Sequence, residues 1–193
     1  MANASTTGFG FRPIKKIAQN YNNAALSEYS VAASSALISH ACLVQLTADG
    51  VVLASGNTTT NNLGTLNGVF YTDATSNKPT FSNFSPAANT ATDIVAFIND
   101  DPMQMYEVMS ADTAFNQNEV GHCADQVLEA GATPLFVSKS KISATTANTQ
   151  AQLFIMGVSR DPDHSDTTEE GFALRVQIRE HILIGNDTQR AGI

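Results

Sequence analysis

The sequence predicts a mostly β protein, built as a single antiparallel β-barrel or jelly-roll-like sandwich with an extended N-terminal arm and at most one or two short helices. Apolar and polar residues alternate through residues 172–184, as in a half-buried strand. Turn residues separate several other short apolar runs, without the regular helical segments that a βαβ fold requires. A chain of 193 residues needs one core, so we assign residues 1–23 to the arm and residues 24–193 to a β-rich body.

The predicted arm mixes aromatic and basic residues with Gly and Pro and shows no helical period. Pro13 biases the preceding residue toward extended backbone. Apolar groups on an extended segment need a surface to cover them, and we expect that surface to belong to a partner protein. The candidate partner-binding residues are Phe9, Phe11, Arg12, Pro13, Ile14, Lys15 and Lys16. Deleting residues 1–18 is expected to abolish partner binding and to leave the body folded.

Two hairpins are predicted in the first half of the body. The first joins residues 42–46 to residues 51–53 through Asp49-Gly50, a pair that favours tight turns. The second joins residues 94–98 to residues 103–109 through a turn rich in Asn, Asp and Pro.

The other expected elements are one helix and four strands. Residues 24–38 are expected to form the helix, and the strands are expected at 69–71, 135–137, 151–158 and 172–184. In the last strand Phe172, Leu174, Val176, Ile178, Ile182 and Ile184 fall on one face, which only Glu180 interrupts. Polar loops are expected at 55–62, around Pro79 and Pro86, and at 138–150.

Charge is distributed unevenly along the chain. Residues 1–18 contain three basic residues and no acid (+3), whereas residues 19–193 contain 7 bases and 18 acids (−11), which together give −8. Because the body is this acidic, it repels a phosphate backbone, and we expect no direct nucleic-acid partner. We expect the basic arm to contact an acidic protein surface instead. Stacking of the arm's aromatic residues on single-stranded nucleic acid is the alternative. No run of 18 apolar residues occurs, so no membrane-spanning helix is expected.

Reactive groups lie together only at His122-Cys123-Ala124-Asp125. Adjacent residues on a strand face opposite ways, so we interpret this tetrapeptide as structural, predict no catalytic residue and expect no enzyme. Cys42 and Cys123 lack ligand spacing, and both are expected to be reduced and buried.

No metal site and no cofactor are predicted. Residues 161–166 carry the alternating oxygen ligands of a calcium loop, but the turn Gly and the distal Glu of such a loop are missing. The four histidines are scattered without zinc spacing.

The order of these features resembles the capsid decoration (cement, or head-stabilising) proteins of tailed bacteriophages. The resemblance is carried by Gly10-Phe11-Arg12-Pro13 and the bases after it, by Asp100-Asp101-Pro102 before an aliphatic-acidic strand, and by a Ser/Thr/Ala-rich connector at 138–150. Leu153 to Val158, the turn Arg160-Asp161-Pro162 and the long last strand complete it.

The resemblance implies a virion structural protein without an active site. Such a subunit is made in the host bacterial cytoplasm, binds the outside of the assembled capsid and cements adjacent copies of the major capsid protein. Self-association is also implied, with a homotrimer expected and a dimer as the alternative. Another virion component, such as a head-completion, tail or fibre subunit, remains the alternative function.

Overall fold

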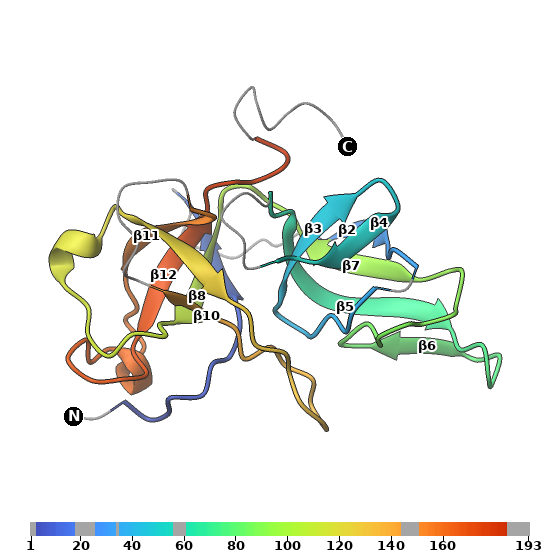
Figure 1. The fold of residues 1–193 in the computed structure, drawn as a ribbon, viewed down its shortest axis with the longest axis horizontal. Coiled ribbons are helices and arrows are strands. Elements are labelled where there is room, and N and C mark those ends of the chain that lie inside the picture. The colour runs from blue at the N-terminus through green and yellow to red at the C-terminus, as the bar shows by residue number, and fades with distance from the viewer. Residues whose placement is uncertain (1–2, 18–25, 34, 56–60, 144–150, 185–193) are drawn as a thin grey trace.

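The computed structural model describes residues 3–17, 26–33, 35–55, 61–143 and 151–184. Within these ranges the chain forms two antiparallel six-stranded sheets, and the only helical elements are two 3-10 turns, η1 (Gln117–Glu119) and η2 (Pro162–His164) (Figure 1). The prediction of a mostly β fold is confirmed. Because two separate open sheets are present, the sandwich alternative fits the structure and the closed barrel does not.

The first sheet has the strand order β1-β8-β12-β11-β9-β10. Its strands are β1 (Arg12–Lys16), β8 (Gln104–Met109), β12 (Ala173–Ile178), β11 (Leu153–Val158), β9 (Cys123–Val127) and β10 (Lys141–Ser143).

The second sheet has the order β2-β7-β5-β3-β4, and β6 also pairs with β5. Its strands are β2 (Ser27–Ser30), β7 (Val95–Asn99), β5 (Gly64–Thr72), β3 (Leu43–Thr47), β4 (Gly50–Leu53) and β6 (Pro79–Ser82). All of them come from residues 27–99, so this sheet is inserted between the first two strands of the other sheet.

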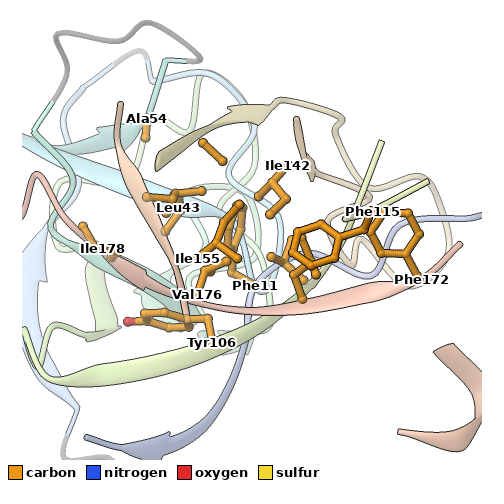
Figure 2. Close-up of a cluster of buried hydrophobic side chains, with 14 residues drawn as sticks. Phe11, Leu43, Ala54, Tyr106, Phe115, Ile142, Ile155, Phe172, Val176 and Ile178 are labelled. Atoms are coloured by element: carbon orange, nitrogen blue, oxygen red, sulfur yellow. The ribbon is translucent and has the colours of Figure 1, made fainter. Parts of the chain in front are cut away.

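The apolar face predicted for the last strand forms part of the core of the first sheet. Phe172, Leu174, Val176 and Ile178 are buried, and they pack with Phe11 and other apolar residues in one cluster (Figure 2). The strand ends at Ile178, so its predicted extension to residue 184 is wrong. The backbone N–H groups of the next two residues both donate to the carbonyl of Gln152, which turns the chain away from the sheet.

The first predicted hairpin is confirmed and the second is wrong. β3 pairs with β4 through a two-residue turn. β7 and β8, by contrast, lie in different sheets, because Ile98 is buried in the core of the second sheet and Tyr106 in the core of the first. The acidic turn between them therefore carries the chain across from one sheet to the other.

Three further expectations fail. The predicted helix at 24–38 contains β2, since the hydroxyls of Ser27 and Tyr29 both donate to the Asp100 carboxylate (2.9 and 2.7 Å) and hold this segment extended beside β7. Residues 135–137 form a turn and one isolated bridge instead of a strand. The predicted loop around Pro79 contains β6.

Of the other predicted strands, 69–71 lies within β5, and 151–158 is present as β11, which begins at Leu153. Of the predicted loop at 55–62 and the connector at 138–150, residues 56–60 and 144–150 lie outside the described ranges.

The described part of the predicted arm, residues 3–17, is extended, but it packs on the body instead of standing apart from it. β1 pairs with β8, and the Phe11 side chain is wholly buried in the first core. Further back, the Asn3 side chain amide donates to the backbone carbonyls of Asp166, Glu169 and Glu170 (2.9–3.2 Å). Residues 3–17 are therefore part of the fold, while residues 1–2 and 18–23 of the predicted arm lie outside the described ranges.

Candidate functional site

The candidate site surrounds β1, where the predicted partner-binding residues lie. β1 is the edge strand of the first sheet. Phe11 precedes it and is a core residue, so Phe11 cannot touch a partner in this fold. Ile14 and Lys15 are partly buried along the strand. Phe9, Arg12 and Pro13 line two hollows on the surface, and Lys16 lines neither of them.

Arg12 is held in place by its neighbours. Its guanidinium carbon lies 3.8 Å from the centre of the Phe9 ring, a cation–π geometry. One guanidinium nitrogen lies 3.8 Å from the carboxylate of Glu107, which also accepts a hydrogen bond from the Ser159 hydroxyl. The side chain remains 48 % exposed and forms no hydrogen bond with any residue that the structure describes. Arg12 is thus oriented, with its five N–H donors available.

A cavity of about 250 Å³ opens beside Arg12, between β1 and the second sheet, and we call it the junction cavity. It is lined by Arg12, Pro13, Leu26, His40, Ala41, Thr65, Leu66, Asn67 and Asn99. The Nδ1 atom of His40 lies 2.9 Å from the Asn67 carbonyl, which fixes the imidazole ring.

Asn99 is the unusual residue of this lining. Its side chain belongs to a residue only 2 % exposed, and neither its amide nitrogen nor its amide oxygen has a hydrogen-bond partner in the structure. Buried amides are normally paired, because an unpaired one loses its bonds to water without replacement.

A second hollow, of about 410 Å³, lies beside Phe9 and is called the Phe9–Leu135 groove. It is lined by Thr7, Gly8, Phe9, Ala132, Thr133, Pro134, Leu135, Val137, Ser138 and Lys139. Leu135 is 69 % exposed, and Lys139 forms no ion pair with a described residue. The lining of the groove therefore combines apolar side chains with one lysine.

Lys16 is already paired within the protein. Its ammonium contacts the carboxylate of Asp101 in the turn between the two sheets (2.5 Å). Burial raises the pKa of Asp101, but the bond and charge of Lys16, together with the bond from the backbone N–H of Met103, outweigh it, so the net pKa of this carboxyl is lowered. Lys16 therefore ties β1 to the turn and is less available to a partner than Arg12.

The structure does not bring the side chains of His122, Cys123 and Asp125 together as a catalytic thiol site would require. The Asp125 carboxylate accepts from the backbone N–H of Gln152 (3.3 Å), and no hydrogen bond joins it to the His122 ring. Neither cysteine forms a disulfide and both are buried, as predicted, and burial raises the pKa of the Cys42 thiol.

The acidic loop at 161–166 is held by its own hydrogen bonds. Asp161 accepts from the backbone N–H of Asp163, and Asp166 accepts from the hydroxyl and the N–H of Thr168, which lowers the pKa of Asp166 to about 2. In the part of the chain that the structure describes, no three His, Cys, Asp or Glu residues gather as metal ligands would.

Sequence reasoning found Phe9, Arg12 and Pro13 but missed the residues opposite them. Leu135 gave a signal, since it is an apolar residue next to a proline, but it was assigned to a strand. His40 and Asn99 gave none, because only the packing of the two sheets brings them to the cavity.

Comparisons with protein-family models, with curated protein sequences and with solved structures found no match for this chain. Among the described residues no helix is long and apolar enough to cross a bilayer.

Proposed function

We propose that this protein is a phage virion structural subunit that binds the outside of the assembled capsid and cements adjacent major capsid subunits. The observation that carries the proposal is the pair of hollows flanking the N-terminal segment, one with an apolar lining that includes Lys139 and one lined in part by Arg12. The order of sequence features, which resembles that of decoration proteins, supports the same role.

The Phe9–Leu135 groove suits a protein partner. An apolar side chain as exposed as Leu135 loses contact with water when a partner covers it, and the released free energy favours docking. Lys139 in the lining favours a partner segment that carries a carboxylate next to its apolar residues.

The charge pattern supports a protein lattice over nucleic acid. Outside the first 18 residues the chain carries a net charge of −11, so a polyanion is repelled except close to the N-terminal cations. A shell that offers many identical copies of an acidic and apolar contact would compensate for a modest affinity at each one. Binding only the assembled shell stabilises it by mass action.

The test is binding of the purified protein to shells assembled without it, measured by co-sedimentation and located by electron microscopy. Leu135→Asp places a charge in the groove without touching the core, and we expect it to weaken binding by about 2 kcal/mol, or about thirtyfold. Failure of the unaltered protein to bind such shells, or its absence from purified virions, would overturn the proposal.

Phe81→Asp is the matched control, because Phe81 is 76 % exposed on β6, in the second sheet, and lines neither hollow. It should bind shells normally. Equal loss of binding in both variants would move the contact away from the groove.

A further inference from the structure

We infer that residues 179–184, which we call the clasp, form an acid-released link between the two sheets. The clasp joins the sheets while His181 is neutral and detaches from the second sheet when His181 is protonated. This behaviour does not require the capsid role, because it concerns only contacts within the chain.

The clasp follows β12 and is bonded to both sheets. The backbone N–H groups of Arg179 and Glu180 donate to the carbonyl of Gln152, which lies just before β11 (2.9 and 3.3 Å). On the other side, the N–H of Asn62 donates to the Glu180 carbonyl (2.8 Å), and the Asn62 carbonyl accepts from the N–H of Ile182 (3.0 Å). Asn62 lies just before β5, so the clasp connects the end of one sheet to the other.

The bonds of the clasp lie outside the strand ladders. β12 ends at Ile178, and its pairing with β8 and β11 is complete by that residue. The contact of the clasp with the second sheet is an isolated bridge between Asn62 and His181. Segments held by so few bonds open at a lower free energy than the ladders do. The clasp can therefore open while both sheets stay paired.

His181 can be charged only if a hydrogen bond inside the clasp is lost. Its Nδ1 atom accepts from the backbone N–H of Leu183 (3.2 Å), and a backbone N–H can only donate, so the proton of the neutral ring is on Nε2. A second proton must bind Nδ1, where it would face the N–H of Leu183. The charged ring therefore sets two donors against each other and disrupts the closed clasp.

The surroundings of His181 also oppose a charge. The side chain is wholly buried, and this burial lowers its pKa from 6.5 to about 4. The carboxylates of Asp100 and Asp101 and the backbone at Leu63 favour the charged ring, but burial outweighs them. Lys16 on β1 is paired with Asp101, and hydroxyls of β2 donate to Asp100, so both carboxylates are already engaged.

The other charged neighbours of His181 belong to the clasp itself. A guanidinium nitrogen of Arg179 lies 3.7 Å from the carboxylate of Glu180, which is a buried residue. Because Glu180 is a buried acid next to the histidine, a variant is needed to separate the effects of the two groups.

Acid favours the open clasp. In the open form His181 meets water and its pKa returns to about 6.5, so the open form binds the proton about 300-fold more tightly than the closed form does. The opening constant is therefore flat at high pH, rises as the pH falls below 6.5 and levels off below about 4. Between pH 7.5 and 4.5 it should increase by about 70-fold.

Hydrogen exchange of the full chain, followed by NMR, tests the clasp. The reporters are the backbone amides of Asn62 and Ile182, and Val176 in the paired middle of β12 reports on the sheets. Each protection factor is the intrinsic exchange rate at that pH divided by the measured rate. We expect the protection of both reporters to fall by about 70-fold from pH 7.5 to 4.5. An unchanged protection factor would overturn the inference.

Urea distinguishes local opening from unfolding of the whole domain. Addition of about 1 M urea should lower the protection of Val176 by about fivefold or more, because global unfolding exposes a large surface. The same urea should leave Asn62 and Ile182 nearly unaffected, because opening of the clasp exposes little. Equal responses of all three amides would show that the clasp opens only when the domain unfolds, and would overturn the inference.

Variants identify the group that takes up the proton. His181→Asn keeps an acceptor for the N–H of Leu183 but cannot be charged, so the pH dependence of the two reporters should disappear. Glu180→Gln should keep it. The matched control is His164→Asn, because His164 is the other buried histidine of the described residues and lies outside the clasp. A pH dependence that survives in His181→Asn, or that is lost in either of the other two variants, would contradict the assignment.

Titration of the His181 ring in the unaltered protein gives a measurement that needs no variant. The ring signals should titrate near the lowered pKa of about 4, while the reporters lose protection over the same pH range. A ring that titrates near 6.5 with the reporters still protected would show that the closed clasp accepts the proton, and would overturn the inference.

Discussion

Replacing Phe11 by alanine tests whether the N-terminal segment is part of the core. Phe11 is wholly buried and packs among Ile155, Val176 and Tyr106 of three different strands (Figure 2). Truncating a buried phenylalanine removes its transfer free energy and leaves a cavity, at a cost of about 3–5 kcal/mol. This is a large part of the roughly 5–15 kcal/mol that stabilises an ordinary domain.

The assay is equilibrium unfolding in urea. With a slope of about 2 kcal/mol per molar, a loss of about 4 kcal/mol lowers the midpoint by about 2 M. Phe9→Ala is the matched control, since Phe9 is only partly buried and its contact with Arg12 is worth about 0.5–1 kcal/mol.

A tether standing apart from the body would tolerate both substitutions equally. The reasoning is therefore refuted if Phe11→Ala unfolds at the same urea concentration as Phe9→Ala. By the same argument, removal of residues 1–18 takes away β1 and a core side chain, so the truncated chain should be strongly destabilised. This prediction replaces the expectation that deleting residues 1–18 leaves the body folded.

Three further predictions concern buried groups. Burial lowers the pKa of His181 from 6.5 to about 4, so the unfolded state binds more protons between these values. The free energy of unfolding should fall by up to about 3 kcal/mol as the pH drops from 6.5 to 4, a slope that His181→Asn should remove in urea melts at several pH values. The Cys42 thiol should resist a thiol reagent under native conditions and react after unfolding, because burial raises its pKa; rapid native labelling would contradict its placement. Gly64→Ala should destabilise the protein in thermal melts by more than about 1 kcal/mol, because the added Cβ would lie 2.0 Å from the Asn99 carbonyl oxygen, and an unchanged melting temperature would argue against this close approach.

Patterns local in sequence predicted much of the fold. Alternation located β12 through Phe172, Leu174 and Val176, and Asp49-Gly50 located the β3–β4 hairpin. Both signals lie within a few residues of the structure that they specify.

Elements whose position depends on residues distant in the sequence were predicted wrongly. The turn at 99–102 looks like a hairpin turn, and only the destinations of Ile98 and Tyr106 show that it joins two sheets. The segment around β2 has helix-forming residues, but its place is set by hydroxyl bonds to Asp100, more than 70 positions away. Tertiary contacts outweigh local propensity at such positions.

The candidate site was half predictable for the same reason. Arg12 and Phe9 lie three positions apart, so composition alone drew attention to them. The opposite wall of the junction cavity comes from His40, Thr65 and Asn99, and no short motif links these positions. Leu135 was noticed as apolar, but its exposure depends on a turn that local propensity did not reveal.

The insertion of residues 27–99 between β1 and β8 imposes an order on biosynthesis. The second sheet can pair as soon as its own stretch has left the ribosome, whereas β1 must wait for Gln104–Met109, and the first core must wait for β12. At elongation rates of about 5–20 residues per second, the wait of β1 for β8 lasts about 5–20 seconds. Throughout this interval the Phe11 side chain is exposed to solvent, whereas in the finished protein it is buried in the first core.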